Sequence, residues 1–300
     1  MSLVRLLRFI LLLLFFGMIS GCNVANDPAT PSYTPTKTIT LTPVPPTPIS
    51  PTNTPLPPPT PTLTPTPVWV FQSGTITCPI LLYHRISEPP LPNSMAARYY
   101  TSPADFEWQM QALEDWGYTT IPVSLLVEAI TRGAPLPPRP VVISFDDGDV
   151  SVSENAYPIM QEYGYTGILY LVGNYIGTPG YMDTDQIQIL YHNGWEIGSH
   201  GMTHPHLPDV HDQLYFEGGQ SKDFLAKEIG ASVQTFAYPF GEIDPFVVSK
   251  IAEYGYLAAV GLGTQSVHRL DTLYYLSRIE VRNGTDQAAF AALLPWSGQH

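Results

Sequence analysis

The chain has 300 residues, a formal net charge of −13 at pH 7 and 44% hydrophobic residues. An acidic chain repels phosphate backbones and anionic lipid headgroups, so its charge argues against nucleic acid as a partner and permits a neutral or cationic one. Only two cysteines, Cys22 and Cys78, are present, so the sequence does not describe a disulfide framework.

The first 21 residues have the pattern of a secretory signal. Arg5 and Arg8 precede an apolar run over residues 9–16, and small residues follow it. The apolar part is too short to predict a membrane span. The sequence Ile-Ser-Gly-Cys that ends at Cys22 resembles a bacterial lipobox, which implies cleavage before Cys22, diacylglycerol on its sulfur and anchoring to the outer side of the cytoplasmic membrane. An ordinary signal with an incidental cysteine is the alternative.

Residues 22–67 are predicted to form a disordered tether. From Pro28 to Pro67 the chain holds 15 Pro and 13 Thr in 40 residues, with Lys37 as the only charge. Such a composition cannot bury a core and favours extended polyproline II. At about 3.1 Å per residue the tether would reach on the order of 120 Å, enough to hold a domain well away from a membrane. Passive disorder, the alternative, would have the same mechanical consequence.

Residues 68–300 show no second change of composition and are long enough for one domain with its own core. The expected strands are residues 80–83, 141–145, 167–172, 195–197, 235–238, 257–260 and 276–281. The expected helices are residues 103–117, 123–131, 152–163, 185–192, a segment within 212–229, 245–254 and 286–294. Repeated β-α units predict a parallel sheet, open or closed, and about seven strands favour an irregular barrel. Cys78 is expected to be a buried thiol just before the first strand.

The strand that ends at Phe145 organises the domain. Val141 to Phe145 form a nearly continuous apolar run, as a strand buried on both faces requires. Asp146 and Asp147 follow at once, and adjacent side chains of an extended segment point to opposite sides. One carboxylate can therefore hold a metal while the other faces a reacting water, and Gly148 lets the backbone turn away. For this stretch alone, an ordinary Asp-Gly turn is the alternative.

A second motif follows the strand that starts at Trp195. His200 and His204 are four residues apart, a spacing that places both imidazoles on one side of a helical turn and suits a single metal ion. His206 adds a third imidazole and leaves open which pair binds. A carboxylate at the end of another strand, Asp147, would complete a three-ligand site with room for water, as in hydrolytic zinc centres. A structural role for the histidines is the alternative.

The third motif, residues 235–241, reads Thr-Phe-Ala-Tyr-Pro-Phe-Gly and is again a strand that runs into a turn. The three motifs occur in this order, each at a strand end, and together resemble the polysaccharide deacetylases, carbohydrate esterase family four, with the NodB-homology domain. The resemblance covers residues 78–294. It implies an α/β fold, a distorted (β/α)7 barrel, that removes N- or O-acetyl groups from glycans with the help of a divalent metal.

Carried over by position, the resemblance implies roles for individual residues. Asp146 resembles the general base. The metal ligands that it implies are Asp147, His200 and His204. The turn Tyr238-Pro239-Phe240 resembles the lining of the substrate groove, where the backbone N–H of Phe240 would help to hold the oxyanion. The metal is expected to be Zn²⁺, with Co²⁺ or Ni²⁺ able to replace it.

Two departures from the family pattern concern the catalytic charges. The third motif of the family usually begins with an arginine that pairs with the catalytic aspartate, whereas this chain has Ala237 there. Asp146 therefore needs another partner, for which Arg278 is the candidate. The late Leu-x-His motif of the family is missing. The segment around His84, Ile-Leu-Leu-Tyr-His-Arg-Ile, resembles instead the branch that deacetylates poly-N-acetylglucosamine in biofilm matrices, which implies His84 as the general acid; a histidine that merely caps the strand is the alternative.

The sequence thus predicts a metal-dependent hydrolase at the cell surface that removes acetyl groups from an N-acetylated glycan, either poly-N-acetylglucosamine or a polymer like peptidoglycan or chitin. Two alternatives stay open: an O-acetyl esterase of the xylan type, which would use the same metal site, and a non-catalytic carbohydrate-binding protein. A serine hydrolase is disfavoured because the chain has no Gly-x-Ser-x-Gly elbow. The expected partners are the N-acetylated polysaccharide and, through Cys22, the membrane.

Overall fold

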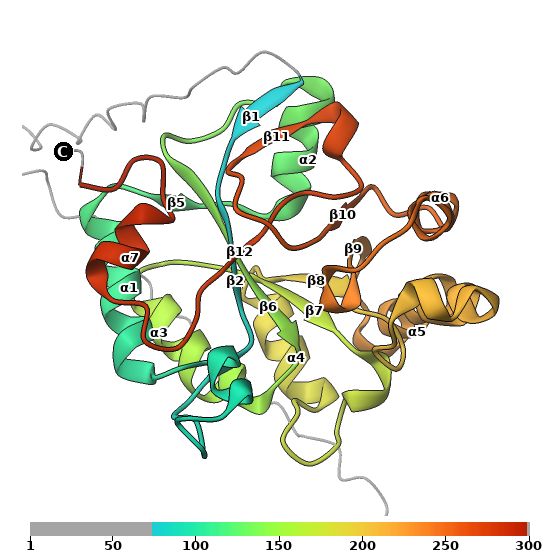
Figure 1. Ribbon diagram of the computed structural model, residues 1–300, viewed down its shortest axis with the longest axis horizontal. Coiled ribbons are helices and arrows are strands. Elements are labelled where there is room, and N and C mark those ends of the chain that lie inside the picture. Colours follow the sequence, from blue (N-terminus) through green and yellow to red (C-terminus); the bar gives the residue numbers. More distant parts are fainter. Residues whose placement is uncertain (1–73, 299–300) are drawn as a thin grey trace, which may run out of the picture. The chain divides into compact units, whose positions relative to one another are not determined.

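A computed structural model describes residues 74–298 (Figure 1). At its centre a curled parallel sheet has the strand order β10-β9-β8-β7-β6-β2-β12, and β5 pairs separately with β6. The strands are β2 (Ile80–Tyr83), β5 (Thr119–Thr120), β6 (Pro140–Asp147), β7 (Ile168–Leu171), β8 (Glu196–Ser199), β9 (Val233–Ala237), β10 (Ala258–Val260) and β12 (Ile279–Glu280). All of these pairs are parallel, which confirms the predicted α/β fold.

Helices connect the strands and surround the sheet (Figure 1). They are α1 (Pro103–Asp115), α2 (Val123–Arg132), α3 (Tyr157–Glu162), α4 (Thr184–His192), α5 (Ser221–Ile229), α6 (Pro245–Glu253) and α7 (Gln287–Ala292). Helix α1 begins where the sequence predicts, because the Ser102 hydroxyl accepts a hydrogen bond from the Asp105 amide at 3.0 Å and so caps the first turn.

Two predicted helices differ from their expected form at the amino end. Residues Val152–Ala156 and Tyr215–Gln220 are π-helical turns, η2 and η6, that lead into α3 and α5. Such turns are frequent at functional sites, and side-chain periodicity does not distinguish them from an α-helix. The structure also contains short 3-10 turns: Met95–Tyr99, Gly173–Tyr175, Leu207–Asp209, His211–Gln213, Pro239–Gly241 and Leu270–Thr272.

The side chains of β6 alternate between two buried clusters. The odd-numbered residues from Val141 to Phe145 lie in an outer cluster, between the sheet and the helices that pack on it. Val142 lies in an inner cluster, inside the curl of the sheet, to which α2 also contributes. Ser144 and then Asp146 follow Val142 on the same face of the strand. The alternation therefore points Asp146 into the barrel, a direction that the sequence alone did not assign.

The sheet closes through an irregular segment between β10 and β2. Leu276 donates its backbone N–H to the Ala259 carbonyl at 2.8 Å and accepts from the Gly261 amide at 2.9 Å, and Arg278 accepts from the Gly263 amide at 2.9 Å. Directly after Arg278, β12 pairs with β2. One segment thus joins both edges of the sheet, although only two of its residues form a regular strand. This confirms a distorted barrel and shortens the strand predicted over residues 276–281.

Two small sheets were not predicted. Strand β1 (Thr75–Thr77) pairs with β11 (Val267–Arg269), and β3 (Arg85–Ile86) pairs with β4 (Tyr100–Thr101). Strands of two or three residues carry no periodic signal in a sequence. Cys78 lies between β1 and β2 and is fully buried, as predicted; burial raises the pKa of its thiol.

The predicted signal peptide, the lipidated Cys22 and the tether over residues 22–67 lie outside the described residues. The same is true of the boundary predicted at residue 68. Within residues 74–298, no helix has both the length and the apolar character that a bilayer crossing needs.

Candidate active site

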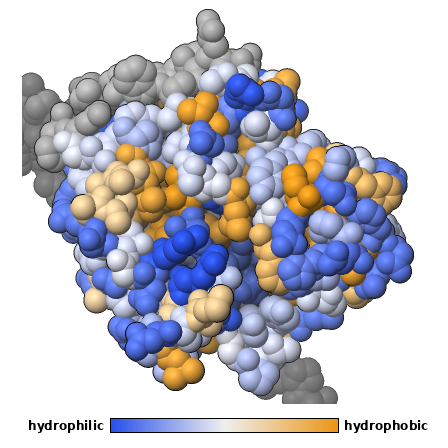
Figure 2. Space-filling model, in the orientation of Figure 1, coloured by the Kyte–Doolittle hydropathy of each residue, from blue (hydrophilic) through white to orange (hydrophobic). Residues whose placement is uncertain are grey.

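The carboxyl ends of the strands surround a pocket of about 350 Å³. Figure 2 shows hydrophilic side chains gathered in a hollow on this face, with hydrophobic residues around it. In a parallel α/β barrel this end of the strands is where ligands bind. The residues that line the pocket are Leu82, His84, Arg85, Arg98, Tyr99, Asp146, Asp147, His200, His204, Tyr238, Phe240, Gly241, Leu262, Arg278 and Glu280.

The two aspartates at the end of β6 reach the pocket in different ways. Asp146 is almost fully buried, with 3% of its side chain exposed, whereas 17% of the Asp147 side chain is exposed. Asp147 has a φ of 72°, in the left-handed region that non-glycine residues seldom adopt. Gly148 follows with a φ of 87°, and a Cβ there would lie 2.9 Å from the Leu171 side chain. The backbone turn that follows the two carboxylates therefore requires glycine at residue 148.

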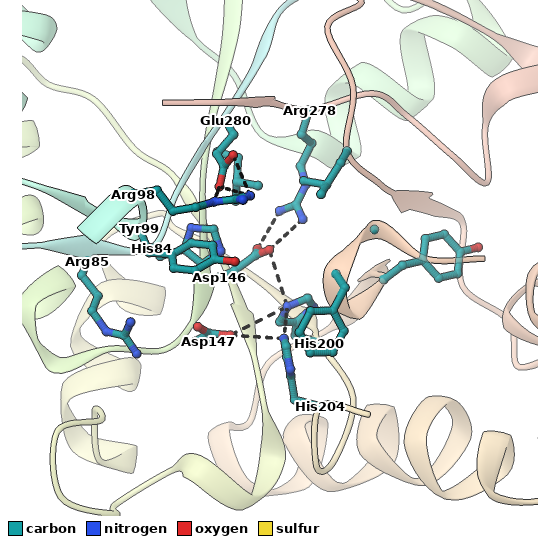
Figure 3. A pocket seen from close by; sticks show the side chains of 15 residues that line it. His84, Arg85, Arg98, Tyr99, Asp146, Asp147, His200, His204, Arg278 and Glu280 are labelled. Carbon is teal, nitrogen blue, oxygen red and sulfur yellow. Dashed lines mark hydrogen bonds and ion pairs between the residues drawn. The ribbon is translucent and has the colours of Figure 1, made fainter. Parts of the chain in front are cut away.

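Asp147, His200 and His204 form a group able to hold one metal ion. Each offers a ligand atom, and the three atoms lie within 4.8 Å of one another. The Nε2 atoms of the two histidines are 3.2 Å apart, and those of His200 and His204 lie 3.8 and 3.6 Å from Asp147 Oδ1 (Figure 3). Two imidazoles and a carboxylate suit a divalent ion of the zinc type.

The chemistry of the two histidines fits this role. His200 Nδ1 donates to the Ala237 carbonyl at 2.8 Å, which fixes the tautomer that leaves Nε2 with a lone pair. Burial, opposed by nearby Asp146, lowers the pKa of His200 to about 4, and burial also lowers the pKa of His204. Both rings are therefore neutral at pH 7, the form that a metal requires.

Arg278 holds Asp146 through a two-point ion pair. Its Nη1 and Nη2 atoms donate to the two carboxylate oxygens at 2.6 and 2.7 Å, and both side chains are buried (Figure 3). Burial by itself would raise the pKa of Asp146, but Arg278 and His200 outweigh it and hold the pKa well below its usual range. The prediction that Arg278 replaces the family arginine missing at Ala237 is confirmed.

His84 lies in the same pocket, at the end of β2. Its ring meets Tyr99 edge to face at a centroid distance of 4.8 Å, and Figure 3 shows both beside Asp146. Burial lowers the pKa of His84, while Asp146 and Asp147 act in the opposite direction. The structure thus places His84 with Asp146 at the pocket mouth, as the sequence predicts; its role as acid stays a prediction.

His206 lies away from the metal-ligand group. Its ring stacks on Phe240 at 4.0 Å, and its Nδ1 lies 2.7 Å from Glu242 Oε2. Half of its side chain is exposed. The structure therefore favours His200 and His204 as the ligand pair, the question that the sequence left open.

The residues of the turn after β9 differ in exposure. Tyr238 lines the pocket but is fully buried, Pro239 is buried and does not line it, and Phe240 is 44% exposed. Phe240 has a φ of 60°. Within residues 74–298, four residues other than glycine have a positive φ. Three of them line the pocket: Asp147, His204 and Phe240. Strained backbone of this kind gathers at functional sites.

Sequence reasoning missed several pocket residues, among them Arg98, Tyr99 and Glu280. Arg98 and Tyr99 come from a 3-10 turn with no periodic signal, and the Arg98 guanidinium lies 4.8 Å from the Tyr99 ring. Glu280 pairs with Arg98 at 3.1 Å. Because Glu280 and Arg278 are two residues apart on a predicted strand, strand alternation could have placed both on the same face.

Comparison with known proteins identifies this constellation. The sequence family described as polysaccharide deacetylase matches residues 133–259, which include Asp146 and all three members of the metal-ligand group. This part of the chain is thus similar to a polysaccharide deacetylase domain. His84 and Arg278 lie outside the matched residues; His84 directly follows β2 and Arg278 directly precedes β12, the two strands that pair where the barrel closes.

Relatives extend the similarity of the deacetylase to about three quarters of the chain. YxkH of Bacillus subtilis, a polysaccharide deacetylase by name, is 26% identical over 227 residues, 75% of this chain and 79% of the relative. A poly-β-1,6-N-acetyl-D-glucosamine N-deacetylase of Staphylococcus aureus is 25% identical over 250 residues, 73% and 83% of the two chains. The crystal structure of a polysaccharide deacetylase from Bacillus cereus superposes with a TM-score of 0.65 at 27% identity, over 73% and 69% of the chains. Fold and family agree in making the protein a deacetylase hydrolase.

Proposed function

We propose that this protein is a metal-dependent N-deacetylase of an N-acetylglucosamine polymer. The observation that carries the proposal is the meeting of three groups in one pocket: the metal-ligand group, the Asp146–Arg278 pair and His84. Similarity to a poly-β-1,6-N-acetyl-D-glucosamine N-deacetylase over most of both chains supports the choice of substrate. A polymer like peptidoglycan or chitin carries the same acetamido group and is the second choice.

Asp147, His200 and His204 would hold the metal. A divalent ion bound there would polarise the acetyl carbonyl and lower the pKa of water from 15.7 toward about 7. The donor set of one carboxylate and two neutral imidazoles favours zinc, with cobalt or nickel able to substitute.

The remaining steps would be carried out by groups that do not bind the ion. Asp146, ionised and oriented by Arg278, would accept the proton of the attacking water. The backbone N–H of Phe240 would donate to the oxygen of the tetrahedral intermediate. His84 would give a proton to the departing nitrogen, because an amine leaves poorly unless it is protonated.

The exposed ring at the pocket rim would bind the sugar. Phe240 is 44% exposed, whereas Tyr83 and Tyr238 are buried in the core and cannot stack on a sugar face. Aromatic faces bind the apolar sides of sugar rings well, so Phe240 is the best placed of these three. The stack of His206 on Phe240 would hold the ring in position.

The proposal is tested by mass spectrometry of acetyl loss. The panel contains N-acetylglucosamine oligomers with β-1,6 links, chitin oligomers, peptidoglycan fragments and acetyl-xylan, each with and without a chelator. We expect release of acetate from the β-1,6-linked oligomers, abolished by the chelator and restored by added Zn²⁺. Activity on acetyl-xylan alone would favour the O-acetyl esterase, and binding without release on every substrate would favour the non-catalytic alternative.

We also propose that the enzyme acts at the cell envelope, anchored through lipid on Cys22. The support is the sequence alone: a positive and apolar start, the Ile-Ser-Gly-Cys motif and a Pro/Thr-rich stretch after it. A polymer outside the membrane would then lie within reach of the catalytic domain.

A further inference from the structure

A buried carboxylate holds the turn between the two histidines of the metal-ligand group. Glu217 is fully buried. Its Oε2 accepts hydrogen bonds from the backbone amides of Met202 and Thr203 at 2.7 and 2.9 Å, and its Oε1 accepts from the Thr203 hydroxyl at 2.5 Å. All three donors are uncharged. A buried carboxylate needs hydrogen-bond donors, and the backbone N–H groups that supply them are held in place by it.

The contacts of Glu217 constrain the backbone just before His204. Gly201 approaches Glu217 so closely that a Cβ there would lie 2.9 Å from Oε2. Met202 and Thr203 are tied to the carboxylate, and His204 follows with a φ of 64°. A strained conformation of this kind persists only where its surroundings fix it. Glu217 supplies that constraint within the five-residue turn from His200 to His204.

Glu217 is itself anchored by the π-helical turn η6. The Ser221 hydroxyl donates to the carbonyls of Glu217 and Gly218, the latter at 3.1 Å. The Tyr256 hydroxyl donates to the Gly218 carbonyl at 2.8 Å. Ser221 also lies 2.8 Å from the Ser199 hydroxyl at the end of β8, one residue before His200. The wider π turn thus frees carbonyls for a buried polar network that connects η6 with the strand that carries His200.

We propose that Glu217 is a positioning residue for the metal site: its carboxylate fixes the turn so that the Nε2 atoms of His200 and His204 face the same ion. This inference rests on the proposed metal-dependent function. Glu217 would act through the backbone that joins the two histidines. Partners of this kind orient ligands, and their loss usually weakens metal binding about 10- to 100-fold.

The chain offers a matched control. Glu196, at the other end of β8, is a largely buried carboxylate that also accepts from two backbone amides, those of Val123 at 2.6 Å and Ser124 at 3.1 Å. Val123 and Ser124 are the first two residues of helix α2, which packs in the inner cluster away from the pocket. Glu217→Gln and Glu196→Gln therefore remove the same charge from the same kind of contact. Only the first should affect the metal.

The test measures metal affinity in apo protein by competition with a chelating dye, and the visible spectrum of the Co²⁺ form. We expect Glu217→Gln to raise the dissociation constant for Zn²⁺ about 10- to 100-fold and to shift the Co²⁺ absorption bands. Glu196→Gln should lower the melting temperature and leave both measurements as in the wild type. Thr203→Val, which removes only the hydroxyl donor, should weaken binding in the same direction by a smaller factor.

The outcomes separate this inference from the proposed function. A wild-type protein that binds no divalent ion refutes both. Metal binding in the wild type that Glu217→Gln leaves unchanged refutes the positioning role alone, as does an equal loss of affinity in Glu196→Gln. If Glu217→Gln does not fold, Thr203→Val decides: an unchanged affinity and Co²⁺ spectrum would overturn the inference.

Discussion

The Asp146–Arg278 pair gives a prediction that can be worked out in numbers. We consider Arg278→Met, which keeps most of the side-chain volume and removes the guanidinium. Arg278 is 1% exposed and Asp146 is 3% exposed, so the substitution leaves a carboxylate buried without its partner. The carboxylate cannot turn to solvent from inside the barrel.

The cost follows from the contacts. Arg278 donates two charge-assisted hydrogen bonds to Asp146, at 2.6 and 2.7 Å. Hydrogen bonds to charged groups contribute about 1.5–3 kcal/mol each, and removing one partner of a buried ion pair costs about 3–5 kcal/mol. We therefore expect Arg278→Met to lower the free energy of unfolding by about 4 kcal/mol. Loss of orientation at Asp146 should also lower kcat by about 10²-fold or more.

The assay is urea unfolding of metal-free protein in the presence of a chelator, so that ion binding does not enter the comparison. Arg269→Met is the control, because Arg269 makes the same two-point contact with Asp271, at 3.0 and 2.7 Å, on the surface. More than half of each of these side chains is exposed, so water screens the pair and no measurable change is expected. Equal stability of the two variants would refute the reasoning about the buried pair.

Four further predictions concern single residues. Cys22→Ser should release the protein from membranes, measured by fractionation of cells; a mutant still extracted only with detergent would contradict the lipid anchor. His200→Ala should remove bound metal and activity, whereas His206→Ala, which alters only the stack on Phe240, should keep stoichiometric metal by elemental analysis; loss of metal in the second variant would mean that the ligand pair is wrong. His84→Ala should lower kcat on the amide substrate by about 10²- to 10⁴-fold with metal content intact, and by less on an activated aryl acetate, whose leaving group needs no proton. Equal losses on the two substrates would remove the acid role. Burial lowers the pKa of His268 to about 4, below its unfolded value of 6.5. The contribution of the neutral buried ring to the free energy of unfolding is therefore complete above pH 6.5 and is lost as the pH falls toward 4. Denaturant unfolding at several pH values should show that the free energy of unfolding of His268→Gln falls by about 3 kcal/mol less than that of the wild type between pH 6.5 and pH 4. Parallel plots of this free energy against pH would contradict the assignment.

The central part of the site could be predicted because its chemistry follows regular strands. Asp146 and Asp147 are the last two residues of β6, where they directly follow its apolar run, and strand alternation separates their directions. The absence of an arginine at Ala237 pointed to a distant replacement, and Arg278 fills that place. In each case a strong local pattern coincides with a strand end.

The rest depends on contacts between segments that have no pattern of their own. Tyr99 reaches the pocket from a 3-10 turn, and Glu217 reaches the metal-ligand turn from a π turn that periodicity reads as α-helix. The fold brings His204 next to Asp147 and His200, whereas His206 stacks on the outer Phe240 ring and pairs with Glu242. The segment around Leu276 reads as one long strand, yet its irregular path joins two edges of the sheet. Tertiary contacts decide all of these, and a single sequence does not display them.

The closure of the barrel also determines the order in which the parts of the site come together. Strand β12 pairs with β2, so Ile279 meets Leu81 across about 200 residues of chain, a separation typical of slow folding. Arg278 pairs with Asp146 and fixes its orientation only when that last segment has docked. A nascent chain that still lacks the residues beyond 270 therefore has its metal-ligand side chains but neither the closed barrel nor the Asp146–Arg278 pair. The chain is thus inactive while it is being synthesised, and the site becomes complete with the final strand.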